Sequence, residues 1–295
     1  MTFWELWQQK KRPTVSFEFF PARNEDAAEK LHRVIDDLSL LKPDFVSVTF
    51  GAGGSTSEGS YQLAKHLAVE NKLPVVTYLA GIGLTRNQVQ DILIRYKNIG
   101  IQSVLCVRGD QAKDEQTPVQ SGDFTNASDL LEFVKTNFDF RLGAAGYPEG
   151  HSESQDKETD WDFLKLKTEK GAQFIISQYF YDNEYFFNFM NQCRSRDINT
   201  PIIAGIMPIY SVNMMETLAE LCGTTITKRI RDGLANIDPE DKNAVEIFGI
   251  EFALQQCGEL LENGVDGLHF YTMDRSQSVG RIIAQLKQAG WLHNE

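Results

Sequence analysis

Short apolar, β-branched runs alternate with longer amphipathic stretches along the whole 295-residue chain. Runs of about five such residues predict strands, whereas stripes spaced three or four apart predict helices. Leu31, Ile35 and Leu38, for example, mark one face of a helix. Eight strands are expected, at Val15–Phe20, Phe45–Thr49, Val75–Leu79, Ser103–Val107, Arg141–Ala145, Phe174–Ser177, Ile202–Ile206 and Gly267–Phe270.

Amphipathic helices are expected in the intervals between these strands. Gly100, Gly171, Gly264 and Gly290 fit the position just past a helix end, which favours glycine. The interval Thr227–Glu262 is long and predicts extra helix before the eighth strand. The helices predicted from the stripes are Ala27–Leu41, Glu58–Val69, Gln88–Ile99, Ser128–Phe138, Trp161–Lys170 and Glu184–Arg196.

Eight successive strand-then-helix units predict an α/β protein of the (β/α)8 TIM-barrel type, a single domain over residues 1–295 with an extra helical segment before the last strand. A doubly wound sheet is the alternative, but it usually has fewer strands and a glycine-rich first turn. Gly51–Gly54 and Gly81–Gly83 both miss the dinucleotide-binding and P-loop spacings. The polar stretch Gln111–Asn126 predicts a long loop after the fourth strand.

Composition narrows the choice of partners. Hydrophobic residues make up 42% and charged residues 24%, as in ordinary globular proteins. The net charge of −12 argues against binding to nucleic acid or to an anionic membrane. The sequence offers no apolar run of signal-peptide or bilayer-spanning length, so we expect a cytoplasmic protein. Its cysteines and histidines lack metal-ligand spacing, so we expect reduced thiols and no metal.

Barrel enzymes carry their chemistry at the carboxyl ends of the strands, and the first strand offers an acid there. Phe17 and Phe19 alternate with Glu18, so Glu18 faces the barrel interior if the phenylalanines face the helices. A buried carboxylate is unfavourable unless it is paired or protonated, and a protonated carboxyl can act as a general acid. The alternative is a structural Glu18 in a salt bridge across the barrel floor.

The ends of strands two, four and five carry residues suited to a polar ligand. The glycines of Gly51–Gly54 would admit a ligand close to the backbone, or form a plain turn. Arg108 and Asp110 flank a glycine after strand four, where an exposed turn is the alternative. Tyr147 and His151 follow strand five and could stack on a ring or hold a phosphate, although a proline turn with a surface histidine is equally ordinary.

Later segments add amides and cations. Asp160, Lys165 and Lys167 lie near the start of the next helix, where the lysines could meet a diphosphate or simply be solvated. Gln178 ends strand six and could hydrogen-bond a heterocycle, and Arg275 follows strand eight, well placed for a substrate carboxylate. Since no serine or cysteine nucleophile lies beside a histidine, the set favours organic-cofactor chemistry over hydrolysis.

Six short motifs occur in order, each at the end of an expected strand. They are SFEFFP at 16–21, SVT at 47–49, RGD at 108–110, AGYPE at 145–149, SQYF at 177–180 and HFYT at 269–272. From about Val15 to Arg275 the chain resembles the methylenetetrahydrofolate reductase family in its short bacterial form. The resemblance implies a homo-oligomeric FAD barrel that reduces 5,10-methylenetetrahydrofolate to 5-methyltetrahydrofolate by ping-pong hydride transfer from NADH or NADPH, in one-carbon metabolism and methionine synthesis.

The resemblance also implies roles for individual residues. Glu18 would protonate N10 of the folate and open its five-membered ring. Asp110 would lie beside the flavin and the pterin, Gln178 would serve both folate and nicotinamide, and Arg275 would meet the folate. The implied FAD contacts are Thr49, Phe50, Ala52, Tyr78, Arg108, Gly109, Asp110, Ala127, Tyr147, His151, Asp160 and Lys167.

The chain departs from the family pattern at four positions. Tyr78 stands where a histidine is common, Asn126 where a tyrosine is frequent, and Met214 and Leu218 where a glutamine and a gating phenylalanine are expected. The regulatory domain of the eukaryotic form is expected to be absent, and with it inhibition by S-adenosylmethionine. Two other functions remain open: another FAD-dependent barrel oxidoreductase of the proline-dehydrogenase type, and a non-catalytic folate- or flavin-binding paralogue.

Overall fold

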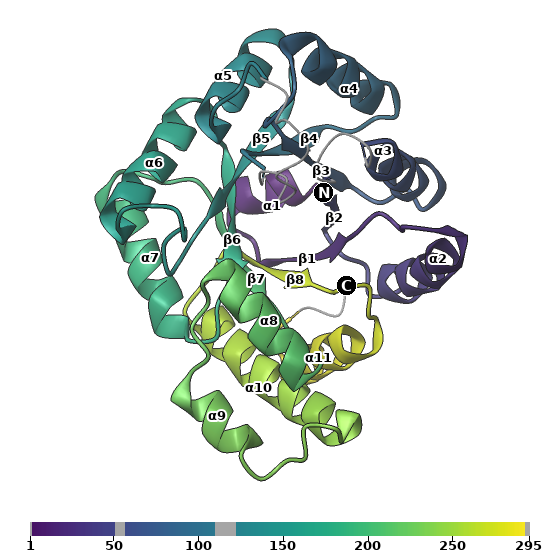
Figure 1. Ribbon diagram of the computed structural model, residues 1–295, viewed down its shortest axis with the longest axis vertical. Helices are drawn as coiled ribbons and strands as arrows, with labels where there is room; N and C mark the ends of the chain where they lie inside the picture. The colour runs from purple at the N-terminus through teal and green to yellow at the C-terminus, as the bar shows by residue number, and fades with distance from the viewer. Residues whose placement is uncertain (1, 51–56, 110–121, 293–295) are drawn as a thin grey trace, which may run out of the picture.

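The computed structural model describes residues 2–50, 57–109 and 122–292. Its eight parallel strands pair in chain order, and the last pairs with the first to close a barrel (Figure 1). The predicted fold is therefore confirmed. The strands are β1 (Thr14–Phe19), β2 (Phe45–Val48), β3 (Val75–Ala80), β4 (Ser103–Val107), β5 (Arg141–Gly146), β6 (Phe174–Tyr179), β7 (Ile202–Ile206) and β8 (Gly267–Tyr271).

Helices surround the barrel, and each glycine predicted to end one has a positive φ (Figure 1). The expected extra helix before β8 is present as α9 and α10. A π-helical turn, η1 (His66–Glu70), continues α3. The helices are α1 (Phe3–Gln9), α2 (Glu25–Ser39), α3 (Ser57–Lys65), α4 (Arg86–Asn98), α5 (Ala127–Asn137), α6 (Lys157–Glu169), α7 (Asn183–Ser195), α8 (Val212–Cys222), α9 (Lys228–Leu234), α10 (Lys242–Glu262) and α11 (Gln277–Gln288).

Alternation along β1 directs its apolar side chains outward, as the sequence predicted. Phe17 and Phe19 are fully buried in the layer between strands and helices, where they join Leu31 and Ile35 of α2 in one core. Glu18 therefore points to the barrel interior, because neighbouring strand residues face opposite sides.

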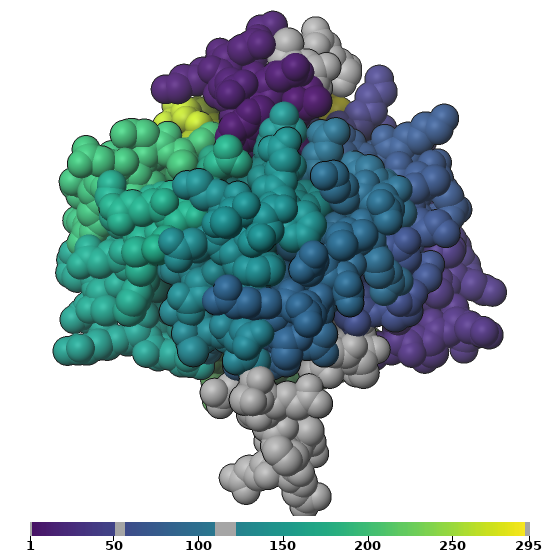
Figure 2. Space-filling view, turned by 90° about the horizontal axis from the view of Figure 1, so that it is seen from above, coloured from purple at the N-terminus to yellow at the C-terminus, as the bar shows by residue number. Residues whose placement is uncertain are grey.

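The short helix α1 closes the amino-terminal end of the barrel, and the sequence pattern did not predict it. The Phe3 ring lies 4.7 Å from that of Phe45 at the start of β2. The Trp7 ring lies 5.5 Å from that of Phe174 at the start of β6, and the indole N–H donates to Thr14 Oγ1 at 3.0 Å. Figure 2 shows this segment, in purple, at one end of the molecule. Aromatic side chains thus fill the base of the barrel.

A separate apolar cluster lies under α8, α9 and α10. Its buried members include Tyr179 and Tyr181 from β6 and the turn after it, and Ile209 and Tyr210 after β7. The long excursion before β8 thus packs its own core beside the barrel mouth. Within the described ranges, no helix is both long and apolar enough to cross a membrane.

Candidate active site

Glu18 is the buried carboxyl of the barrel interior. Only 3% of the residue is exposed, and its Oε2 atom has no hydrogen-bond partner among the described residues. Among the described residues, the basic side chain nearest to this carboxyl is His269, whose Nε2 lies 3.8 Å from Oε2, beyond hydrogen-bond reach. Thr272 Oγ1 donates to the backbone oxygen of Glu18 at 2.6 Å and fixes the strand end. Within the described chain, no Lys or Arg forms the alternative salt bridge across the floor.

His269 lies beneath this carboxyl in a network of hydroxyls. Its Nδ1 lies 2.8 Å from Ser16 Oγ and its Nε2 lies 3.3 Å from Ser47 Oγ, and the ring is fully buried. Both ring nitrogens thus have partners on β1 and β2. His269 was not predicted to take part in the site. The available signal was alternation, since the outward-facing Phe270 requires His269 to face inward.

Two tyrosines complete the surroundings of Glu18. Tyr271 Oη donates to the backbone oxygen of Ser177 at 2.8 Å. Its ring fits because residue 205 is glycine: a Cβ there would lie 2.8 Å from a Tyr271 ring carbon. Burial, followed by the neighbouring carboxyl of Glu18, raises the pKa of both Tyr78 and Tyr271 well above the usual value. The structure therefore groups Tyr78 with Glu18.

A β-bulge sets the position of Gln178. Between the pairs Ile176–Ile203 and Tyr179–Gly205, β6 contains one residue more than β7. Such bulges re-aim a side chain, and they are common beside active sites. The Gln178 side-chain oxygen accepts the N–H of Tyr179 at 3.0 Å, which orients its amide at the strand end.

Four residues assigned to FAD by the resemblance form one cluster after β5. The Tyr147 and His151 rings meet edge to face at 4.6 Å. Lys167 Nζ lies 5.7 Å from the Tyr147 ring centre and donates to the backbone oxygen of Ala145 at 3.2 Å. Burial raises the pKa of Asp160, which Lys167 partly offsets, and burial lowers the pKa of Lys167, which Asp160 partly offsets. The neighbouring Lys165 instead reaches Glu169 at 3.9 Å on the helix surface.

The end of β4 allows close approach to the backbone. Gly109 has φ of 88°, and a Cβ there would lie 2.8 Å from the Ala80 Cβ, so glycine is required. Arg108 forms a 2.5 Å ion pair with Glu153 in the segment before α6. The predicted residues Asp110 and Ala52 lie outside the described residues, as do Gly51–Gly54 and most of the expected long loop.

The remaining predicted residues lie at or near the same end of the barrel. Thr49 and Phe50 are partly exposed directly after β2, and Ala127 is buried at the start of α5. Asn126 caps that helix, because its side chain accepts the N–H of Asp129 at 3.0 Å, which gives this departure a structural reason. The exposed Arg275 lies with its guanidinium 5.2 Å from the Tyr210 ring centre.

Met214 and Leu218, the two departures on α8, are partly buried. Both pack against the apolar cluster beneath that helix. They therefore contribute apolar surface where the family pattern would place an amide and an aromatic ring.

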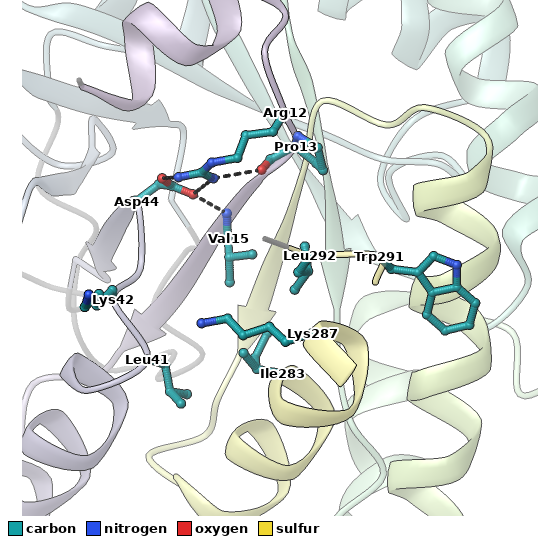
Figure 3. A pocket seen from close by; sticks show the side chains of 10 residues that line it. All are labelled: Arg12, Pro13, Val15, Leu41, Lys42, Asp44, Ile283, Lys287, Trp291 and Leu292. Atoms are coloured by element: carbon teal, nitrogen blue, oxygen red, sulfur yellow. Dashed lines mark hydrogen bonds and ion pairs between the residues drawn. The ribbon is translucent and has the colours of Figure 1, made fainter. Parts of the chain in front are cut away.

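A small cavity lies near the opposite end of the barrel, between β1 and α11 (Figure 3). Its volume is about 30 Å³, which is room for about one or two water molecules. Arg12 and Asp44 beside it are joined by two hydrogen bonds of 2.9 and 2.7 Å. Because a flavin or a folate is far larger, this cavity is not the site predicted from the sequence.

The fold and these strand-end side chains define a (β/α)8-barrel protein with a polar site at the carboxyl ends of its strands, where barrel enzymes act. In the described part of the chain, no group of three or more His, Cys, Asp or Glu residues could hold a metal ion. The profile of the family "Methylenetetrahydrofolate reductase" matches residues 5–287. The chain belongs to the methylenetetrahydrofolate reductase family.

Individual relatives agree with this assignment. Methylenetetrahydrofolate reductase 1 of Schizosaccharomyces pombe is 33% identical over 280 residues, which cover 94% of this chain and 46% of that protein. The 5,10-methylenetetrahydrofolate reductase of Pectobacterium carotovorum is 33% identical over 269 residues, covering 90% of this chain and 87% of the relative. The chain thus spans about half the length of the yeast relative and most of the bacterial one.

A solved structure has the same fold. An uncharacterized protein from Clostridium thermocellum that binds two copies of 5-methyl-5,6,7,8-tetrahydrofolic acid superposes with a TM-score of 0.67. The match covers 97% of this chain and 98% of that one, at 17% sequence identity. At this identity the likeness supports the barrel fold alone.

Proposed function

We propose that this protein reduces 5,10-methylenetetrahydrofolate to 5-methyltetrahydrofolate with NADH or NADPH, through a bound FAD. Family membership supports the reaction class. The observation that carries the proposal is the buried carboxyl of Glu18, whose Oε2 has no hydrogen-bond partner among the described residues. A proton or a ligand donor at that atom removes the penalty of an unsatisfied buried acceptor.

The residues after β4 and β5 fit FAD. Lys167 supplies a partly buried cation, Tyr147 and His151 supply rings, and Gly109 admits a ligand close to the backbone. When bound, FAD supplies hydride transfer, taking a hydride from the nicotinamide and passing it to the folate in turn. The residues of the chain bind these groups, align them and transfer a proton to the folate.

Glu18 holds the proton that the folate needs. Protonation at N10 turns that nitrogen into a good leaving group, so the five-membered ring opens before the hydride arrives. Thr272 anchors the backbone at Glu18 through a hydrogen bond. His269, which is hydrogen-bonded to Ser16, and the aromatic residues of the barrel base fill the interior below the carboxyl and exclude water from it.

Three further residues would position the substrates. Gln178, aimed by the bulge, offers its amide to the folate pterin and then to the nicotinamide. Arg275, at the rim, offers its guanidinium to a carboxylate of the folate. We propose that Asp110 lies beside the flavin and the pterin, where negative charge favours the cation that forms when the ring opens.

The proposal is tested by the cofactor spectrum and by turnover. The purified protein should be yellow from FAD that denaturation releases. Without methylenetetrahydrofolate it should oxidise one NADH or NADPH for each flavin, and it should turn over catalytically only when methylenetetrahydrofolate is present. Flavin reduction by proline in place of the nicotinamide would favour the proline-dehydrogenase type. Folate and flavin binding without turnover would indicate a non-catalytic paralogue, and a colourless protein that FAD cannot reconstitute would overturn the proposal.

A further inference from the structure

Glu149 ends the AGYPE motif at 145–149, and the proposed function gives it no role. Its two carboxylate oxygens accept the backbone N–H of Thr225, at 3.1 and 3.2 Å. Thr225 lies in the turn between α8 and α9, 76 residues further along the chain. The carboxylate therefore joins the loop between β5 and α6 to a segment that follows β7.

A tight turn links Glu149 to the first ring of the proposed FAD cluster. The N–H of Gly150 donates to the backbone oxygen of Tyr147 at 3.0 Å and closes a β-turn. Pro148 occupies the second position of this turn, where its fixed φ is favoured. His151 is held as well, because its Nδ1 accepts the backbone N–H two residues later, at 3.1 Å. The positions of Glu149 and of the two rings therefore depend on one another.

Two further contacts hold the turn after α8. Gly223 ends the helix with φ of 71°, and a Cβ there would lie 3.9 Å from the Cβ of Ser152, so the two segments touch again. The buried Thr224 donates from Oγ1 to the backbone oxygen of Tyr179 at 3.4 Å. The turn is thus fixed between the loop after β5 and the end of β6.

Helix α8 also packs beside the strand that neighbours Glu18. Its Met214 and Leu218 join the apolar cluster that includes Tyr271. Tyr271 pairs with Glu18 in the register of β8 and β1. One end of α8 therefore contacts the loop of the FAD cluster, while one face of the same helix borders the proposed folate site.

We propose that Glu149 is a positioning residue that holds α8 against the loop between β5 and α6, so that FAD binding and the placement of α8 favour each other. The inference rests on the proposed function for the identity of the cofactor. Glu149 acts through Tyr147 on one side and through Thr225 on the other. Because coupling between two sites is reciprocal, FAD should stabilise the turn after α8 by the factor by which the Glu149 contact strengthens FAD binding.

The test compares Glu149→Ala, which removes the acceptor of the Thr225 N–H, with Glu149→Gln, which keeps one acceptor oxygen. When the protein is stripped of FAD and titrated with it, Glu149→Ala should raise the dissociation constant of FAD about fivefold, the worth of one hydrogen bond. Glu149→Gln should recover most of this loss. The matched control Glu169→Ala removes a carboxylate that faces Lys165 on the surface of α6, and it should leave FAD affinity unchanged.

Hydrogen exchange over residues 223–226, followed by mass spectrometry, measures the turn itself and needs no turnover. FAD should slow exchange there in the wild type and in Glu149→Gln, and should have no such effect in Glu149→Ala.

The outcomes separate this inference from the proposed function. A wild type that binds no FAD would reject the proposed function and the inference with it. Equal FAD affinity in the wild type and Glu149→Ala would overturn the role of Glu149 alone. So would a loss that Glu149→Gln does not recover, or a slowing of exchange by FAD that persists in Glu149→Ala.

Discussion

The substitution Glu18→Gln separates the two half-reactions of the proposed function. The amide keeps the shape of the side chain but cannot donate a proton as an acid. Reduction of FAD by the nicotinamide is a hydride transfer that needs no protein acid, so it should proceed at a near-normal rate. Oxidation of the reduced flavin by methylenetetrahydrofolate should nearly stop, because N10 then lacks its proton donor.

The surroundings of Glu18 set the size of the effect. In the described part of the chain Oε2 has no donor within hydrogen-bond reach, and both His269 nitrogens have serine hydroxyls as partners. The raised pKa values of Tyr78 and Tyr271 make their hydroxyls poor acids. Without a substitute, loss of a general acid slows the step by about 10²–10⁴-fold, or about 3–5 kcal/mol in the barrier.

Stopped-flow absorbance of the flavin measures both half-reactions on the same sample. Glu259→Gln on α10 is the matched control, because this carboxylate binds Asn183 at 2.6 Å and should leave both rates unchanged. Equal slowing of both half-reactions in Glu18→Gln would mean that Glu18 is structural. If neither slowed, the assignment of the acid would be wrong.

Three further substitutions test other parts of the molecule. Asp110→Asn should raise the flavin reduction potential and slow transfer to the folate more than about tenfold; an unchanged potential would place Asp110 away from the flavin. Lys167→Met should weaken FAD binding about tenfold or more, measured by the fluorescence of released flavin, since it removes a partly buried cation. Trp7→Ala should lower the free energy of unfolding by about 3–5 kcal/mol in urea titrations, because it empties the base of the barrel; a loss below about 1 kcal/mol would mean that α1 is loosely attached.

Periodicity predicted the barrel well because each strand is apolar on the face that meets the helices. Phe17 and Phe19 revealed the direction of Glu18 in this way, and the long interval before β8 revealed the extra helix. Helix α1 was missed because its seven residues give too short a stripe, although Phe3 and Trp7 are buried. Its stability comes from packing against Phe45 and Phe174, which are distant in sequence.

The site was less predictable, because its geometry depends on contacts between distant segments. Gln178 was recognised as a strand-end amide, but the bulge that aims it depends on pairing with β7. His269 was overlooked because a lone histidine in a strand carries no signal until Ser16 and Ser47 are seen beside it.

The aromatic base formed by α1 has a consequence for the order of events. Phe3 and Trp7 fill one end of the barrel, so we expect small molecules to enter and leave at the other end, where the strands end. Under the proposed function, the nicotinamide must leave before the folate can enter, so the two substrates occupy the same site at the barrel mouth in turn. A substrate in excess therefore also binds to the form of the protein that should react with the other substrate, and blocks it. Each should inhibit the reaction at high concentration, and relieve the inhibition caused by the other.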